Sequence, residues 1–345
     1  MSGLSRFLRS GGAEVLQNAA MYATPFRKDA KHSSGGPVVF RPQWTADGRT
    51  IVAAWGNSDG GIENIAALPF GRPGVTRFIA LNDENDASLT YPLALTNDQL
   101  FLSAKSDALI SIDLLTGQLT THPMPKEVHL LPDPTSDRLG YIAEHNAEDN
   151  TSEFGLFEPR SLTLKPLMTF KTGSDFIPIA ICPGELRVAF IEKSSTLVVV
   201  DRGREQLRKD LKKSNEDLGI GNLIFSPKGD MLYASFQMKA DGSDHVSYGF
   251  LEIPVPGGEV RRMTLIPEAP KPANDQLIYY FQVSVSHDGQ TLAAASTYLA
   301  GKGDDGRQLM PQDCALFLVD LKKPQRNVIR IPIPLPAWPN AKSIK

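Results

Sequence analysis

A short polar turn followed directly by an apolar run recurs six times along the chain, and this recurrence constrains the fold more than any other feature. Its clearest copy is Ser226-Pro227-Lys228-Gly229-Asp230, which precedes the β-prone run Met231–Phe236. Asp-Gly and Pro-x-Gly tolerate the positive φ that a tight hairpin requires, so each turn is expected to join two strands. Strand-turn-strand units that repeat at this kind of period predict a β-propeller, because no unit can bury both of its faces alone.

The spacing of the copies fits units of four strands. The first strand residues after the turns are Ile51, Leu100, Leu139, Leu186, Leu232 and Leu292. The spacings between them are 49, 39, 47, 46 and 60 residues, which suit four short strands with their connections better than a helical repeat. We predict an all-β, six-bladed β-propeller with four antiparallel strands per blade. Seven blades remain an alternative, because residues 1–36 have room for an incomplete unit, and an all-β sandwich is the simpler alternative.

The repeat divides the chain into three regions. Residues 1–36 are predicted to form a basic, partly flexible segment, residues 37–335 the propeller, and residues 336–345 a C-terminal tail. The proline-rich segment 331–339 predicts an edge strand that continues as polyproline II, since proline cannot donate a hydrogen bond to a sheet.

The repeated units resemble the WD40-like repeats of TolB-type propellers, which also occur in relatives of prolyl oligopeptidase. Residues 226–232 and 286–292 match the Ser-Pro-Asp-Gly-x-x-Leu core of that repeat best, and residues 45–51 come next. The other three units are degenerate, and none carries the paired Gly-His and Trp-Asp ends of a true WD40 repeat. The resemblance covers residues 37 to 335 and implies a fold that many functions share.

Composition and targeting signals fit a globular chain. Hydrophobic residues make up 41% and charged residues 22% of 345 residues, and no apolar run is long enough to predict a membrane span. The first residues have no apolar core of a signal peptide, which predicts a cytoplasmic protein. TolB-type relatives are usually exported, so a periplasmic location remains the alternative if the native start differs. Cys182 and Cys314 are predicted to be buried thiols.

The connections between strands give the best indication of function. In a propeller the connections from second to third strand, and from fourth strand to the next blade, emerge on one face. The segments predicted there are 56–64, 144–153, 238–247, 300–313 and 80–90, and together they hold 14 acidic and three basic residues. The whole chain has a net charge of only −3, so acidity is concentrated on one predicted face.

An acidic face has three interpretations. It can steer a protein partner with a basic contact surface, hold Ca²⁺ or another divalent ion, or simply keep the protein soluble. It argues against nucleic acid on that face, because phosphates would be repelled. The predicted binding residues are acidic and come from several units: Asp59, Glu63, Glu144, Glu148, Asp149, Asp241, Asp244, Asp304 and Asp305.

No motif decides whether the protein is an enzyme. The six histidines show no His-x-x-x-His zinc spacing, but His145 and His245 fall in acidic connections and are candidates for a metal site or the central channel. A propeller lactonase uses carboxylates, amide side chains and sometimes histidine around its axial channel, often with a divalent ion, and the length of this chain would suit one. The basic stretch 202–213 is interpreted as an exposed outer strand, with contact to phosphate or to an acidic protein as the alternative.

The sequence therefore predicts a scaffold without catalytic activity that binds a protein partner through the acidic face. A lactonase-like or other metal-dependent hydrolase with its site at the central channel is the alternative. The two differ in whether a bound ion is present and required.

Overall fold

The computed structural model consists of antiparallel sheets that follow one another along the chain. The structure describes residues 39–45, 47–48, 50–56, 62–69, 77–80, 87–88, 94–104, 108–124, 128–133, 138–146, 151–171, 179–182, 184, 186–240, 242, 245–270, 280–300, 310–322 and 326–333. The predicted N-terminal segment and C-terminal tail lie outside these residues, so the predicted domain bounds stay predictions.

Each sheet is made of strands that are consecutive in the chain. Sheet A contains β1 (Val39–Trp44), β2 (Thr50–Gly56), β3 (Ile62–Pro69) and β4 (Arg77–Ala80). Sheet B contains β5 (Ala87–Ser88), β6 (Ala94–Leu95), β7 (Gln99–Ala104), β8 (Ala108–Asp113) and β9 (Leu119–Pro123). Sheet C contains β10 (His129–Pro132), β11 (Leu139–Asn146), β12 (Thr151–Glu158) and β13 (Thr163–Lys171).

The remaining three sheets repeat the pattern. Sheet D contains β14 (Ile179–Cys182), β15 (Arg187–Glu192), β16 (Thr196–Asp201) and β17 (Arg204–Asp210). Sheet E contains β18 (Glu216–Phe225), β19 (Met231–Ala240), β20 (His245–Pro254) and β21 (Arg261–Pro270). Sheet F contains β22 (Tyr280–Val285), β23 (Thr291–Ala300), β24 (Met310–Asp320) and β25 (Val328–Ile333).

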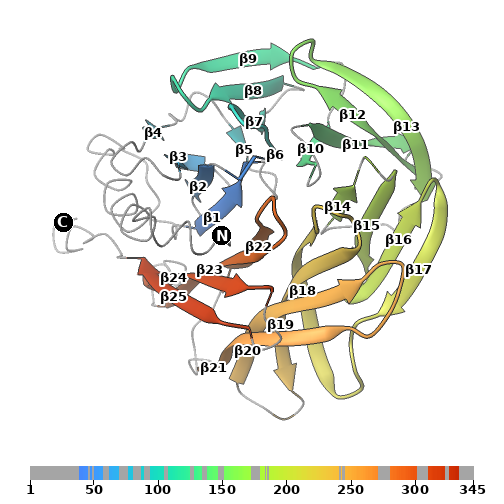
Figure 1. Cartoon of the computed structure of the whole chain (residues 1–345), viewed down its shortest axis with the longest axis vertical. Coiled ribbons are helices and arrows are strands. Elements are labelled where there is room, and N and C mark those ends of the chain that lie inside the picture. The colour runs from blue at the N-terminus through green and yellow to red at the C-terminus, as the bar shows by residue number, and fades with distance from the viewer. Residues whose placement is uncertain are drawn as a thin grey trace, which may run out of the picture.

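The sheets are arranged around a centre as the blades of a β-propeller (Figure 1). The first strands β1, β10, β14 and β22 lie nearest the centre, and β9, β13 and β17 lie on the outside. Strand β1 of the first sheet packs beside β22 and β23 of the last, so the two ends of the described chain meet. The predicted all-β propeller with antiparallel blades is therefore confirmed.

The predicted blade count needs correction. Five sheets in the described residues have four strands in the order first to fourth, rather than the six or seven regular blades expected from the sequence. Sheet B departs from the pattern because two separate two-residue strands, β5 and β6, both pair with β7 where the other sheets have one first strand. Its turn at Thr96-Asn97-Asp98 lacks the glycine of the best copies, and this unit was among the degenerate ones in the sequence.

The recurring turn has a common hydrogen-bond pattern in four sheets. In sheet F, the Ser286 hydroxyl accepts from Thr291 N at 3.0 Å and donates to Asp288 Oδ1 at 2.6 Å. Equivalent hydroxyl-to-carboxylate bonds join Thr45 to Asp47, Thr96 to Asp98 and Ser226 to Asp230. The hydroxyl closes the turn from inside, and in sheets A, E and F a glycine with positive φ, such as Gly289 at 66°, completes it.

The turns of sheets C and D use other residues. In sheet C the buried Asp133 takes the place of the hydroxyl, and Arg138 approaches its carboxylate to 3.6 Å. In sheet D the equivalent residue is the buried thiol Cys182, and Leu186 adopts a φ of 53°. Leu186, predicted to open a strand, thus lies in the turn itself, and β15 begins one residue later.

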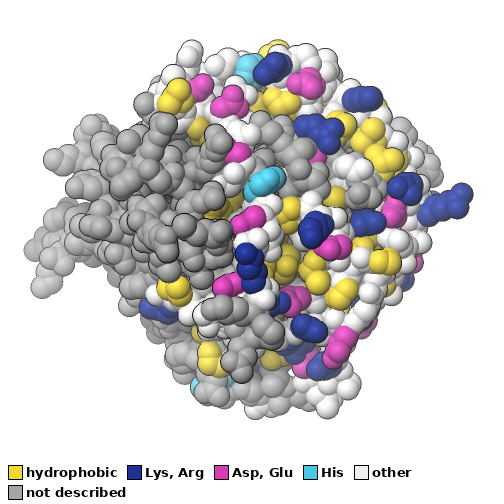
Figure 2. Space-filling view, viewed as in Figure 1, with side chains coloured by type: hydrophobic (Ala, Val, Ile, Leu, Met, Phe, Trp, Pro, Cys, Tyr) yellow, Lys and Arg dark blue, Asp and Glu magenta, His cyan; other side chains and the backbone are white. Residues whose placement is uncertain are grey.

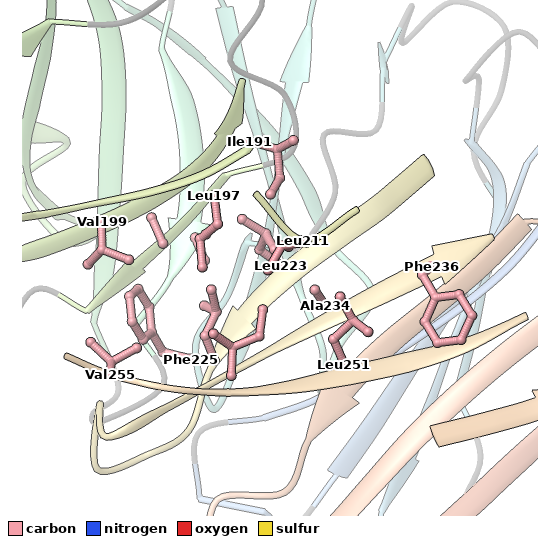
Figure 3. Packing of buried hydrophobic residues seen from close by; sticks show 14 of the residues in the cluster. Ile191, Leu197, Val199, Leu211, Leu223, Phe225, Ala234, Phe236, Leu251 and Val255 are labelled. Atoms are coloured by element: carbon pink, nitrogen blue, oxygen red, sulfur yellow. The ribbon is translucent and has the colours of Figure 1, made fainter. Parts of the chain in front are cut away.

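Apolar clusters between adjacent sheets hold the ring together. Between sheets D and E, side chains such as Val199, Leu223, Phe225 and Leu251 interdigitate (Figure 3). Similar clusters lie between sheets B and C, C and D, and E and F. Each fully buried Phe or Leu contributes about 1.5–3 kcal/mol through removal from water, so these interfaces explain why a single blade would not be stable alone.

Candidate functional site

The predicted acidic site lies mostly outside the described residues. This applies to Asp59, Glu148, Asp149, Asp241, Asp244, Asp304 and Asp305. The backbones of Glu63, in β3, and of Glu144 and His145, in β11, are described, but their side chains are not. His245 opens β20 and is exposed. Whether these side chains come together thus remains a prediction.

The predicted connections are shorter than the sequence suggested, because the strands extend into them. Glu63 lies within β3 at a register shift between the pairs of Ile62 and Asn64, and Glu144 lies opposite Ser152 in the β11–β12 hairpin. Strands β19 and β20 have ten residues each and reach Ala240 and His245. These segments were therefore wrongly expected to be loops throughout, since alternating polar and apolar residues at the tips of long hairpins resemble loop composition.

The strand order divides the connections between two sides of the propeller. We call the turn side the one with the first-to-second strand turns, at 45–48, 96–98, 226–229 and 286–289. We call the loop side the one with the second-to-third strand connections, at 57–61, 147–150, 193–195, 241–244 and 301–309, together with the connections between sheets. In an antiparallel sheet these two sets of connections leave from opposite ends of the strands.

On the turn side, neighbouring sheets are joined through their turns. Asp47 N donates to Asn97 Oδ1 at 2.8 Å and so connects sheets A and B. Gly48 lies against His287, and Gly289 against Pro227, which connects sheets A, F and E. The turns of sheets B, A, F and E are therefore linked in series, and those of sheets C and D lie partly outside the described residues.

Two arginines add ionic links on the turn side. The Arg187 guanidinium donates to Gly229 O of sheet E at 2.7 Å and to Asp201 at 2.9 Å. Arg326 of sheet F donates to Glu252 of sheet E at 2.8 Å. The carboxylates are largely buried, and each has a guanidinium partner, as buried charges require.

On the loop side, sheet D has a short and fully described connection. Lys193 and Ser194 join β15 to β16 with φ values of 50° and 68°, which L-residues other than glycine rarely adopt. Leu211 N donates to Ser195 O, and Asp210 Oδ1 accepts from Ser195 Oγ and from Lys212 N. The connection after β17 is therefore fastened to the β15–β16 turn.

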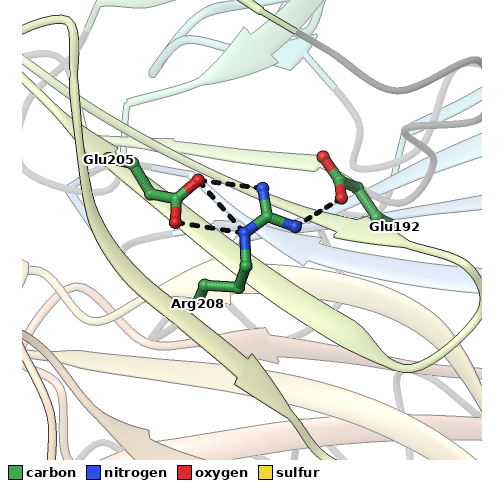
Figure 4. Close-up of polar contacts among 3 residues, drawn as sticks. All are labelled: Glu192, Glu205 and Arg208. Carbon is green, nitrogen blue, oxygen red and sulfur yellow. Dashed lines mark hydrogen bonds and ion pairs between the residues drawn. The ribbon is translucent and has the colours of Figure 1, made fainter.

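Strand β17 is an exposed outer strand, as predicted for the basic stretch, and it forms the edge of sheet D. Its central cation, Arg208, donates to Glu205 and, at 2.6 Å, to Glu192 (Figure 4). Hydrogen bonds from Arg208 lower the pKa of Glu205, and the two carboxylates raise the pKa of Arg208. Arg208 is thus neutralised locally, although it stands in a basic stretch.

Cationic side chains are spread over the right half of Figure 2, which holds sheets C, D and E in this view, and acidic side chains lie among them. Within the described residues no group of three or more His, Cys, Asp or Glu side chains is arranged to hold a metal ion. The predicted Ca²⁺ or other divalent site stays a prediction, because most of its residues are outside that part of the chain.

Three polar contacts between strands were missed by sequence reasoning. Tyr141 donates to the buried carboxylate of Glu153 at 2.5 Å, and burial, followed by this contact, raises the tyrosine pKa. Ser111 Oγ and His122 Nε2 lie 2.8 Å apart. Asn222 joins β18 to β22 through both the N–H and the C=O of Val283. Each contact joins residues on different strands, and no motif of neighbouring residues predicts it.

The segment Gly56-Asn57-Ser58-Asp59-Gly60 has the spacing of a hydrolase nucleophile elbow. The elbow requires a turn from a strand into a helix, whereas this segment lies between β2 and β3, which pair with each other. The spacing therefore does not indicate a catalytic serine.

Comparisons with known proteins do not identify a family for this chain. No protein-family model and no curated protein sequence matches the chain. A candidate 6-phosphogluconolactonase from Bacteroides uniformis has 14% sequence identity and a TM-score of 0.42, covering 85% of this chain and 86% of its own. A chain of the mitotic checkpoint complex has 15% identity and a TM-score of 0.40, covering 74% of this chain and 71% of its own. Similarity at this level carries no information about substrate or partner.

No helix in the described part of the chain has the length and apolar character needed to cross a membrane.

Proposed function

We propose that the protein is a β-propeller scaffold without catalytic activity that binds a basic protein partner through the loop side. The binding residues are the acidic side chains predicted from the sequence: Asp59, Glu63, Glu144, Glu148, Asp149, Asp241, Asp244, Asp304 and Asp305. Sheet B, in this proposal, acts as a sixth, irregular blade of a TolB-type, WD40-like ring.

The observation that supports this most is the division of the connections between the two sides. On the turn side, contacts join the turns of sheets A, B, E and F, whereas the loop-side connections differ in length from sheet to sheet. The acidic segments all connect strands on that side, and they hold 14 acidic residues against three basic ones. Such an accumulation attracts a partner with Lys or Arg on its contact surface and speeds their association.

The proposal is tested by the binding of a fluorescein-labelled decalysine peptide to the full chain, followed by fluorescence anisotropy at 20 mM and 200 mM NaCl. We expect binding that weakens with salt and an association rate that falls severalfold in the double variant Asp241→Asn/Asp244→Asn. The matched control is Glu158→Gln/Glu259→Gln, which removes two exposed carboxylates on the turn side, one at the end of β12 and one in the connection between β20 and β21. Equal losses in both variants would overturn the proposal.

The alternative is a lactonase-like, metal-dependent hydrolase with His145 and His245 near the central channel. The exposed position of His245 at the start of β20, beside the acidic connection 241–244, is the observation that favours it. Native mass spectrometry of the gently purified protein separates the two. A stoichiometric ion that chelation removes, together with lactone hydrolysis that is lost with it, would establish the hydrolase, and a co-purified protein would support the scaffold.

A further inference from the structure

The loop side of sheet D differs in charge from the acidic connections around it. Its two connections, 193–195 and 211–215, contain Lys193, Lys212 and Lys213, and all three side chains are exposed. Two hydrogen bonds fasten the first connection to the end of β17 and the second connection, from Leu211 N to Ser195 O at 3.0 Å and from Ser195 Oγ to Asp210 Oδ1 at 2.9 Å. Lys212 N also donates to Asp210 Oδ1 at 3.0 Å. We call the surface formed by these three lysines the lysine corner.

The carboxylates next to the lysine corner are occupied by other groups. Glu192 accepts from Arg208, and Asp210 accepts from Ser195 and a backbone N–H. Glu216 accepts two hydrogen bonds from Arg262, which lower its pKa, and the charge of Lys213 adds to that effect. Within the described residues, neither Lys193 nor Lys212 forms an ion pair through its ammonium group. Asp210 keeps its charge because its donors are neutral, and Asp217 is a second exposed carboxylate beside the corner. Three lysines against these two carboxylates leave the corner with a small excess of positive charge.

We infer that the lysine corner binds an acidic segment of a partner protein. The ammonium groups are exposed and come from two connections, so they form an open surface and not an enclosed pocket. An extended chain with several carboxylates can meet such a surface at separate points. Because the other connections on the loop side are rich in acid, a negatively charged segment would be repelled from them and directed to sheet D.

This inference is independent of the proposed function. It concerns the lysines of sheet D and an acidic partner segment, whereas the proposed function concerns acidic connections and a basic partner. The two are tested by different peptides and different variants, so one can fail while the other stands.

The test uses a fluorescein-labelled decaglutamate peptide and the full-length protein, with fluorescence anisotropy at 20 mM and 200 mM NaCl. We expect binding at 20 mM NaCl that weakens at 200 mM, and a loss of about tenfold in affinity for Lys193→Gln/Lys212→Gln/Lys213→Gln. The matched control is Arg160→Gln/Lys165→Gln/Lys171→Gln, which removes three exposed cations from the β12–β13 turn and β13 of sheet C. Circular dichroism of both variants checks that they are folded.

Three results would overturn the inference. They are no binding by the wild type at 20 mM NaCl, an equal loss of affinity in the two triple variants, and competition by tripolyphosphate at charge-matched concentration that is stronger than by unlabelled decaglutamate. Sedimentation velocity tests whether a second copy of the chain binds the lysine corner through its acidic connections. Self-association of the wild type that disappears in the lysine variant would show this and would also overturn the inference.

Discussion

The turn side and the loop side of this propeller are built from the same strands but differ in how regular their connections are. On the turn side, a hydroxyl and a carboxylate close the turns of sheets A, B, E and F, and these turns contact one another. On the loop side, the connections range from the tight turn at 193–195 to the segment 301–309 between two long strands, and their charge changes from sheet to sheet. The recurring contacts therefore lie at one end of the strands, and the connections at the other end vary from sheet to sheet.

The largest loss of stability is expected when an ionic link is removed from the turn side. Arg187→Met leaves Asp201 and Gly229 O without their guanidinium donor, and we expect a loss of about 2–3 kcal/mol in the free energy of unfolding. Urea unfolding followed by circular dichroism measures it.

The matched variant is Arg208→Met on the loop side, where the arginine side chain is 47% exposed and also bonds two carboxylates. Solvent screens such a pair, so the expected cost is at most about 1 kcal/mol. An equal cost for the two variants would show that the sides do not differ in rigidity.

A smaller effect is expected from the turn hydroxyl. Ser286→Ala removes an acceptor for Thr291 N and the donor to Asp288 in a buried position, and should cost about 1–2 kcal/mol in thermal or urea unfolding. Ser214→Ala, an exposed serine on the loop side, serves as the control and should change stability by less than about 0.5 kcal/mol. A neutral Ser286→Ala would mean that the glycine and the packing alone hold the turn.

The contribution of the ion pair between Glu216 and Arg262 to stability is expected to depend on pH. Hydrogen bonds from Arg262 lower the pKa of Glu216 in the folded protein, so the pair contributes stability above the ordinary carboxyl pKa and loses it as pH falls through the folded value. We expect wild type and Glu216→Gln to differ by at most about 1 kcal/mol at pH 7 and to converge in acid. A difference that persists at low pH would contradict this origin.

The smallest expected effect is a gain. Ser194→Gly relieves a φ of 68° in the loop-side turn of sheet D without changing charge, and should stabilise the protein by about 0.5 kcal/mol. Ser214→Gly, whose residue does not have a positive φ, should be neutral or slightly destabilising. Differential scanning fluorimetry of the two variants is sufficient, and a destabilised Ser194→Gly would show that the turn is not strained.

Much of the fold was predictable because the turn chemistry is local. The hydroxyl of Ser226 and the carboxylate of Asp230 are four residues apart, so their hydrogen bond can be anticipated from the sequence. The best motif match has Lys228 where the resembling repeats have aspartate, and Asp230 takes over the carboxylate role in the structure. The degenerate units were harder to interpret, since Asp133 and Cys182 replace the hydroxyl there.

The candidate site was predictable only in part. Acidity could be counted along the chain, but the extent of the hairpins could not, because strand length depends on whether a partner strand continues alongside. The lysine corner was hidden inside a basic stretch that also contains Arg208, and only the structure separates a neutralised arginine from lysines with no ion pair in the described residues.

The sequence by itself determined the repeat, the antiparallel pairing of its strands and the chemistry of four turns, because each of these depends on residues within a few positions of one another. Tertiary structure alone decided which charges neutralise each other and which sheets meet. Arg187 reaches Gly229 across 42 residues, and Arg326 reaches Glu252 across 74. Such contacts depend on how the sheets pack in three dimensions, and the order of residues along the chain does not show which distant residues come together.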